Sequence, residues 1–444
     1  MSEQRRGICP GLTAPIATGD GLLARLATTA PIDIAAFIEL CKASRAYGNG
    51  IVEVTQRGSV QVRGLRPATV GKFVAKLTSL GLGSDQKPPI LASPLSGLAN
   101  DAVYETIGLV SDLRDALGRE PFVDSLSPKV SVLIDGAGAL HLDDIVADVR
   151  VVARHDGWLH VAVAGDATTA TTLGWTTPQN AVVTVCRLLR EIAANGPMAR
   201  AAVIIGTAGL AGFGGTVANG IVDEPPPAPR GSPRRLGVHP LKNGSVALGV
   251  ALAFGHADAE VLERLAEAAA AAGATSLCPT AGRVLLLVGV PRRAAARMLE
   301  IAEDHGCVVR ANDPRRHVVA CAGAPACASG TLGTRDLAPI VAAVATPLLD
   351  GSVTIHLSGC AKRCAHHGLA HLTVTGPGRL SIEVGQSDTA AAPVAPAVTA
   401  SAFCRLASEC CRIRRPGEDS ADALARLGAA RIASVMRGDQ GTDV

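Results

Sequence analysis

Four of the 12 cysteines in this chain fall into two pairs within the stretch His317–Gly376. The pairs are Cys321-x5-Cys327 and Cys360-x3-Cys364, and each follows an apolar, β-like run and lies in a loop rich in glycine and alanine. Four thiolates are what a [4Fe–4S] cluster needs, and small residues let the backbone fold tightly around it. The spacing matches neither ferredoxins nor the C-x2-C pairs of zinc ribbons. The pattern predicts one [4Fe–4S] cluster bound by all four thiolates, with four buried structural cysteines as the alternative.

The remaining cysteines do not lie in loops of this kind. Cys404, Cys410 and Cys411 belong to a helical tail, where core packing or a reserve of thiols is expected. Small buried hydrophobic side chains are expected at the others, namely Cys9, Cys41, Cys186, Cys278 and Cys307.

The composition is that of a globular protein long enough for two or three domains, with 444 residues, 48% hydrophobic and 18% charged. A net charge of only +3 and 2% aromatic residues indicate no nucleic acid and no membrane surface as partners. The N-terminus has an arginine pair without an apolar run behind it, so we expect no export signal and a cytoplasmic location. A reducing compartment also suits thiolates kept for a metal cluster.

One uncharged run, Ala201–Val222, is long enough to cross a bilayer. Its glycines and threonines dilute its apolar character, and it is followed by the acidic, proline-rich segment VDEPPPAPR. We therefore predict a buried strand, a glycine loop and a linker here, and no membrane span.

The chain contains an internal repeat. A helix predicted over Asp33–Ala46 is followed by a hairpin, and after Pro233 the same order returns with a helix over Ala259–Ala272. Glu39 and Glu263, like Gly58 and Gly282, are separated by 224 positions (263 − 39 and 282 − 58). Nearly the same offset places the strand at 129–136 on that at 352–359, and 149–153 on 372–376. Two copies of one unit, each a small module followed by a larger one, are therefore expected.

The two copies differ at the cysteines. Ala137 stands opposite Cys360, and Ser93 is the expected counterpart of Cys321, so only the second copy is predicted to hold a cluster. Composition shifts, including the linkers Asp223–Pro233 and Ala390–Pro396, divide the chain into a half-module, a larger module without cluster cysteines, a second half-module, a cluster-binding module and a helical tail, at residues 1–84, 85–225, 226–300, 301–392 and 393–444.

Over roughly residues 7–385 the cysteine spacing, the duplication and several basic residues resemble the sirohaem sulfite and nitrite reductase superfamily. The resemblance implies an α+β fold with duplicated sulfite/nitrite reductase-like architecture. Two ferredoxin-like half-modules and two larger α/β modules would be related by a pseudo-twofold axis. It also implies a [4Fe–4S] cluster at the four paired cysteines.

The resemblance further implies a tetrapyrrole-binding set of Thr55, Arg57, Arg63 and Lys129. In the superfamily a T-x-R stretch in the first hairpin turns its arginine to the tetrapyrrole carboxylates, and a later L-P-x-K-x-K strand supplies lysines. Here the first stretch reads T-Q-R, and the second keeps Lys129 but has Ser131 in place of the other lysine. Arginine binds carboxylates in a bidentate manner, which suits a macrocycle rimmed with acetates and propionates. A solvated hairpin arginine is the alternative for Arg57.

The missing lysine, the short chain and the loop H-L-S-G-C-A-K-R-C-A-H-H resemble the precorrin-3B synthases, in which the tetrapyrrole is the substrate instead of a prosthetic group. This likeness implies an oxygen-dependent monooxygenase of the cobalamin pathway that hydroxylates precorrin-3A at C20 and closes a γ-lactone. No flavin or nicotinamide fingerprint appears, so electrons are expected from an external NAD(P)H-derived reductase or ferredoxin.

A mononuclear non-haem iron is also implied by the likeness, because common side chains cannot activate oxygen. His366 and His367 are its candidate ligands, with His356 and His371 nearby, but no 2-His-1-carboxylate pattern occurs in one place. Residues that carry out the chemistry directly are not assigned. A sirohaem-dependent sulfite or nitrite reductase and a non-catalytic cluster or tetrapyrrole carrier remain as alternatives.

Overall fold

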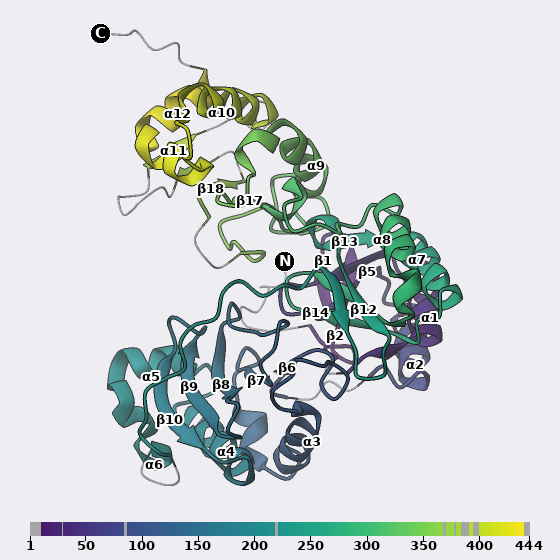
Figure 1. The fold of residues 1–444 in the computed structure, drawn as a ribbon, viewed down its shortest axis with the longest axis vertical. Coiled ribbons are helices and arrows are strands. Elements are labelled where there is room, and N and C mark those ends of the chain that lie inside the picture. The colour runs from purple at the N-terminus through teal and green to yellow at the C-terminus, as the bar shows by residue number, and fades with distance from the viewer. Residues whose placement is uncertain are drawn as a thin grey trace.

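The computed structural model describes most of the chain, namely residues 10–28, 30–83, 87–217, 221–366, 370–376, 379–382, 390–393 and 399–438. Within these residues the chain forms four five-stranded sheets. The two larger modules lie at opposite ends of the molecule's long axis, with the two half-modules between them (Figure 1). None of the described helices is both long and apolar enough to cross a membrane.

The two half-module sheets have the same antiparallel topology and exchange an edge strand. The first has the order β1-β2-β5-β4-β13, and the second β11-β12-β15-β14-β3. Thus β13 from the second copy pairs with β4 of the first, while β3 from the first pairs with β14 of the second. The strands of the first sheet are β1 (Ile16–Thr18), β2 (Gly21–Leu26), β4 (Ile51–Val54), β5 (Val60–Leu65) and β13 (His256–Asp258). Those of the second are β11 (Gly237–Pro240), β12 (Val246–Ala251), β14 (Ser276–Thr280), β15 (Val284–Val290) and β3 (Ile32–Asp33).

Helices from both half-modules share one hydrophobic core. Phe37 and Leu40 of one helix and Leu262 and Leu265 of its counterpart are at most 1% exposed and lie in the same cluster. The Asp33 side chain caps the first of these helices by accepting two backbone N–H groups. The helices are α1 (Ile34–Tyr47), α2 (Val70–Ser79), α7 (Ala259–Ala271) and α8 (Ala295–Asp304). The predicted helices and hairpins of both half-modules are confirmed.

The two larger sheets also repeat one topology, with three parallel strands followed by two antiparallel ones. Val132 pairs with Val149 in the first, and Ile355 pairs with Leu372 in the second, an offset of 223 on both strands. The first sheet contains β6 (Ile90–Ala92), β7 (Val132–Asp135), β8 (Ala147–Ala153), β9 (Leu159–Gly165) and β10 (Thr171–Thr176). The second contains β16 (Val318–Ala320), β17 (Ile355–Ser358), β18 (Leu372–Thr375), β19 (Arg379–Ile382) and β20 (Ala390–Pro393).

Helices pack against each larger sheet and complete its core. In the first copy they are α3 (Thr106–Leu117), α4 (Pro178–Ala194), α5 (Ala201–Ala208) and α6 (Gly214–Val217). In the second copy they are α9 (Thr334–Val344), α10 (Thr399–Ile413), α11 (Ser420–Leu427) and α12 (Ala429–Arg437). Short 3-10 helices occupy turns at η1 (Pro121–Ser125), η2 (Gly209–Phe213), η3 (Ala253–Gly255), η4 (Arg292–Ala294), η5 (Pro314–Arg316) and η6 (Thr346–Leu348).

Two local predictions are wrong. The run Ala201–Val222 begins as helix α5, not as a buried strand, because its alanines and isoleucines lie on a helix of which only Ala201 and Ile204 are buried. The segment Ala390–Pro393, predicted as part of a linker, forms the edge strand β20 instead. The tail that follows it is helical as expected, and Phe403 and Leu406 of α10 are fully buried in the core of the second larger module.

Candidate cluster and substrate site

The paired cysteines follow two neighbouring parallel strands. Cys321 comes directly after β16 and Cys360 two residues after β17, so both loops leave the same edge of the sheet. The loops are bonded to each other: Cys321 N–H donates to the Leu357 carbonyl at 3.2 Å, and Thr331 N–H donates to the Gly359 carbonyl at 2.8 Å. The fold therefore brings together the two pairs that the sequence separates.

The backbone around Cys321 is shaped for a thiolate. Gly359 N–H donates to the Cys321 sulfur at 3.1 Å, the kind of bond that stabilises a ligating thiolate. A Cβ on Gly359 would lie 2.9 Å from the Gly323 Cα, and Gly323 itself has a φ of +60°. Only glycine fits this close approach, so the small residues that the sequence places here serve the packing of the two loops.

All four thiols lie within electrostatic range of one another. Burial raises the pKa of the Cys364 thiol, and the neighbouring sulfurs of Cys360, Cys321 and Cys327 raise it further. Three of them are half-buried and Cys364 is exposed, whereas cysteines such as Cys41 are fully buried. The exposure of the four does not match the alternative of buried structural cysteines.

Across the described residues, no three His, Cys, Asp or Glu side chains converge tightly enough to hold a single metal ion. A [4Fe–4S] cube makes a different demand, because its four thiolates each bind a different iron and stand apart. The donor set, the Gly359 N–H bond to sulfur and the glycine-lined loops fit such a cluster. They are the residues present to hold it.

The histidines of this region do not assemble an iron site in the described part of the chain. The ring of His366 packs edge-on against His356 with centroids 5.7 Å apart, and the His371 Nδ1 accepts the Thr354 N–H at 3.1 Å. His367 lies outside the described residues. A carboxylate that would complete a site with the two imidazoles does not appear among the described residues, and iron ligation by His366 and His367 stays a prediction.

Arg57 contacts the residue that departs from the reductase pattern. Its Nη1 donates to Ser131 Oγ at 3.1 Å and its Nη2 to the Val146 carbonyl at 2.8 Å, while the side chain remains exposed. The two family positions, 74 residues apart, therefore meet in space. Lys129 is exposed two residues before Ser131, and the Thr55 hydroxyl accepts the Ser59 N–H within the hairpin turn.

Arg63 is placed differently. It is only 4% exposed, and its Nε and Nη2 donate to the Asp20 carboxylate at 3.0 and 3.1 Å. Nη2 also donates to the carbonyl of Ala326, inside the Cys321–Cys327 loop, at 2.6 Å. Sequence reasoning missed Asp20 and Ala326 as partners, because no local pattern relates residues so far apart.

Further links join the half-modules to the cysteine loops. Arg335, at the start of α9, forms an ion pair with Glu53 of β4, and Arg283 donates to the carbonyl of Ala365 at 2.9 Å. Burial, together with the charge of Arg316, lowers the pKa of Arg283 to about 10. The second cysteine loop thus lies beside a desolvated guanidinium.

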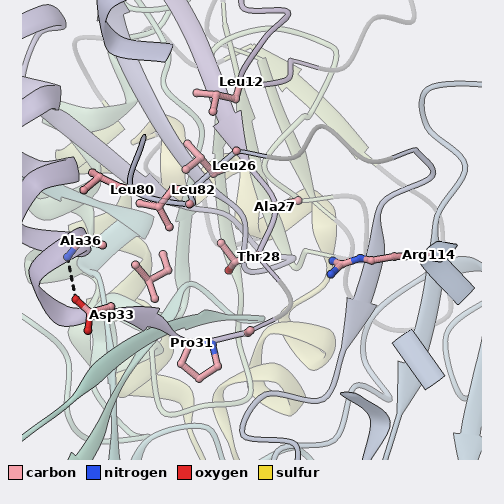
Figure 2. Close-up of a pocket in the computed structure, with 14 residues that line it drawn as sticks. Leu12, Leu26, Ala27, Thr28, Pro31, Asp33, Ala36, Leu80, Leu82 and Arg114 are labelled. Atoms are coloured by element: carbon pink, nitrogen blue, oxygen red, sulfur yellow. Dashed lines mark hydrogen bonds between the residues drawn. The ribbon is translucent and has the colours of Figure 1, made fainter. Parts of the chain in front are cut away.

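A pocket of about 280 Å³ lies elsewhere, beyond the far end of β2 (Figure 2). Leu12, Leu26, Leu80 and Leu82 line it, together with Arg114, which reaches in from α3 and has a pKa lowered by burial. Leu26, at the end of β2, lines the pocket, whereas Asp20 directly precedes the start of that strand. With a rise of roughly 3.3 Å per residue, the whole length of β2 lies between them. It is not part of the cysteine site.

Comparison with known proteins identifies the family. Residues 18–80 match the model of the nitrite/sulfite reductase ferredoxin-like half domain. The chain is 33% identical over 448 residues to a precorrin-3B synthase from a Sinorhizobium species, covering 98% of this chain and 95% of that protein. It is 25% identical to a ferredoxin-dependent sulfite reductase of Mycobacterium tuberculosis, over 78% of this chain and 68% of the relative.

The fold agrees with these relationships. The structure of the Mycobacterium tuberculosis NirA protein matches with a TM-score of 0.76 at 20% identity, covering 93% of this chain and 84% of that one. The duplicated sulfite/nitrite reductase-like architecture expected from the sequence is confirmed. Because a relative at 33% identity spans nearly the whole of both chains, this protein belongs to the precorrin-3B synthase family and is an enzyme.

Proposed function

We propose that this enzyme acts in aerobic cobalamin biosynthesis as an oxygen-dependent monooxygenase that converts precorrin-3A to precorrin-3B. The observation that carries the proposal is the near full-length relationship to a precorrin-3B synthase, together with the two cysteine pairs on neighbouring loops. Oxygenation at C20 inserts one atom of O2 into the macrocycle, and the ring A acetate then closes the γ-lactone. The other oxygen atom leaves as water, with two electrons and two protons from an external reductase or ferredoxin.

Cys321, Cys327, Cys360 and Cys364 would hold a [4Fe–4S] cluster, which supplies one-electron transfer when bound. The chain's own contribution around them is orientation. Gly359 N–H stabilises the Cys321 thiolate, and the backbone bonds between the loops keep the sulfurs in place. A mononuclear iron completed by His366 or His367 belongs to the proposal, but no step depends on it here.

Arg57 is proposed to bind a substrate carboxylate, with Thr55, Lys129 and Arg63 as weaker candidates. Arg57 is exposed and is already oriented by Ser131 and the Val146 carbonyl. An oriented guanidinium loses little freedom when it binds a carboxylate. The donors of Arg63 are directed to Asp20 and Ala326 instead, which favours Arg57 over Arg63.

A sirohaem-dependent sulfite or nitrite reductase is the rival function, favoured by the 25% identity to sulfite reductases. Ser131 speaks against it, because these enzymes need dense positive charge to bind a small anion and to supply protons to it. A non-catalytic cluster or tetrapyrrole carrier is the third possibility.

The test combines a spectrum with a mass measurement on the purified protein. Bound sirohaem gives strong Soret and red bands, whereas a cluster alone gives a broad shoulder. The enzyme with precorrin-3A, 18O2 and a reductant should yield a product heavier by one labelled oxygen atom. Sirohaem bands together with sulfite reduction would overturn the proposal in favour of the reductase, and tetrapyrrole binding without a mass change would favour the carrier.

A further inference from the structure

Arg63 of β5 reaches from the first half-module to the loop that carries two of the cysteines. Its guanidinium is held bidentately by Asp20, in the turn between β1 and β2, and donates to the carbonyl of Ala326 at 2.6 Å. The same carbonyl accepts the N–H of Gly19 at 3.0 Å. Two donors from one half-module therefore hold a single carbonyl at the end of the Cys321–Cys327 loop, directly before Cys327.

The duplication provides an internal control for this contact. In the first copy the register equates Leu98 with Ala326, and Lys242 N–H donates to the Leu98 carbonyl at 2.9 Å, just as Gly19 N–H does to Ala326. The backbone bond is therefore a property of the fold in both copies. The bond from the Arg63 side chain, by contrast, has no equivalent in the first copy.

The position equivalent to Arg63 is Val288. Asp33 and Asp258 precede the equivalent helices α1 and α7 and pair with Ser276 and Ile51, so Ile51 corresponds to Ser276 and Glu53 to Cys278. Their partners Gln61 and Leu286 therefore correspond, and so do the residues two further along. Val288 is 3% exposed in an apolar cluster and carries no side-chain donor. The additional hydrogen bond and the buried charge thus occur only where the loop contains cysteines.

We propose that Arg63 is a positioning residue that, with Asp20, clamps the Cys321–Cys327 loop in the conformation that presents both thiolates to the cluster. The inference rests on the proposed cluster and goes beyond it, because it assigns Arg63 to the cluster loop instead of the substrate. A charge-assisted bond to a carbonyl is among the stronger protein hydrogen bonds. Without it, the Ala326 carbonyl would still accept the Gly19 N–H, the bond that both copies share, but would lose its charged donor.

The experiment measures the loop without relying on activity. In the metal-free full-length protein, Arg63→Met should accelerate hydrogen–deuterium exchange of the amides in residues 321–332 by roughly tenfold to a hundredfold, with residues 93–104 unchanged. Arg63→Lys keeps the charge but loses the bidentate pairing, so an intermediate acceleration is expected. In the reconstituted protein, chelators should remove iron from Arg63→Met faster than from the parent.

Arg235→Met is the matched control. Arg235 is 6% exposed, binds Asp144 through both terminal nitrogens and donates to the His141 carbonyl at 3.0 Å. Both of these partners lie in the larger module of the first copy. Its replacement should loosen residues 137–145 and leave 321–332 unchanged. Unchanged exchange in Arg63→Met, or equal acceleration in both copies, would overturn the clamp. If Arg63→Met does not fold, Arg63→Lys replaces it in the test, and parent-like exchange in Arg63→Lys would overturn the clamp. If Arg63→Met accelerates exchange in residues 321–332 but the parent protein never binds iron on reconstitution, the proposed cluster is wrong while the contact of Arg63 with the loop stands.

Discussion

The two copies hold equivalent loops by different means. In the first copy the carboxylate of Asp135 accepts bonds from Ser93 Oγ at 2.8 Å, from Ala137 N–H at 2.8 Å and from Leu142 N–H at 3.0 Å. It also forms an ion pair with Arg230 at 2.6 Å. Asp135 is 1% exposed, and the loops after β6 and β7 both close around it.

In the second copy Ser358 stands where the first has Asp135, at the offset of 223. Ser358 Oγ donates to the Cys360 carbonyl at 2.7 Å, and Cys321 replaces Ser93. The bond from Gly136 N–H to Ser93 Oγ at 2.8 Å becomes the bond from Gly359 N–H to the Cys321 sulfur at 3.1 Å. The comparison teaches that one scaffold accepts either a buried carboxylate or a set of thiolates at the same place.

The largest expected effect is the loss of the cluster, which concerns the second copy alone. Serine in place of Cys321, Cys327, Cys360 or Cys364 should abolish a stable cluster, because a [4Fe–4S] cube needs all four thiolates. Iron and acid-labile sulfide are measured in each purified variant. Cys404→Ala is the control, since Cys404 is exposed on α10 and should leave the cluster content unchanged. A variant that kept a full cluster would remove its cysteine from the ligand set.

The corresponding substitution in the first copy removes the Asp135 carboxylate and should destabilise that copy. Asp135→Ala removes one of the two carboxylates that pair with Arg230 and leaves the Ser93 hydroxyl and the N–H groups of Ala137 and Leu142 without their acceptor, so it should lower the free energy of unfolding by about 3–5 kcal/mol. Both tryptophans of the chain, Trp158 and Trp175, lie in this copy, so their fluorescence during urea unfolding reports on it selectively. Ser358→Ala is the matched control in the second copy and should cost about 1 kcal/mol or less, measured by far-UV circular dichroism because both tryptophans lie in the first copy. A parent-like urea midpoint for Asp135→Ala would contradict the role assigned to the carboxylate.

Substitution of Arg57 tests whether substrate binding can be lost without loss of the cluster. Its loss as Arg57→Ala should weaken precorrin-3A binding roughly tenfold to a hundredfold, the worth of a charged hydrogen bond of about 1.5–3 kcal/mol. Arg57→Lys keeps the charge without the fork, so an intermediate loss is expected. Cluster content should stay constant, because Arg57 donates to Ser131 and to the Val146 carbonyl, which lie in the larger module without the four paired cysteines. Parent-like affinity in Arg57→Ala would show that this hairpin does not face the tetrapyrrole.

The smallest effect is a difference in acid stability. Burial by itself raises the pKa of Asp143, but the hydrogen bonds and charge of Arg230 outweigh it, so the pKa lies below its ordinary value of 3.8. A carboxylate with a depressed folded-state pKa stabilises the protein above that ordinary value, and the contribution is lost as pH falls through the folded-state pKa. Urea midpoints followed by tryptophan fluorescence should therefore fall in this acid range, and less steeply in Asp143→Asn. Equal pH profiles would refute the assignment.

Much of the architecture followed from local pattern. Helix α1 was predictable because its apolar residues recur at helical spacing behind Asp33, and the hairpins because glycine turns separate alternating strands. The stretch Ala201–Val222 was not, because an uncharged run lacks the periodicity that separates helix from strand. Strand β20 was missed because its alanines pair through the backbone, which composition does not reveal.

By itself the sequence determined which residues are candidates for chemistry: four cysteines in small-residue loops, and an arginine in a glycine hairpin. These are local properties, since ligand type and loop composition are read from neighbouring residues. Only the tertiary structure decided which partner each charge has. Arg57 meets Ser131, while Arg63 is directed to Asp20 and to the Ala326 carbonyl 263 positions away. The two arginines lie on one hairpin and look equivalent in the sequence, and burial and long-range hydrogen bonding separate them, because both depend on which segments fold against that hairpin.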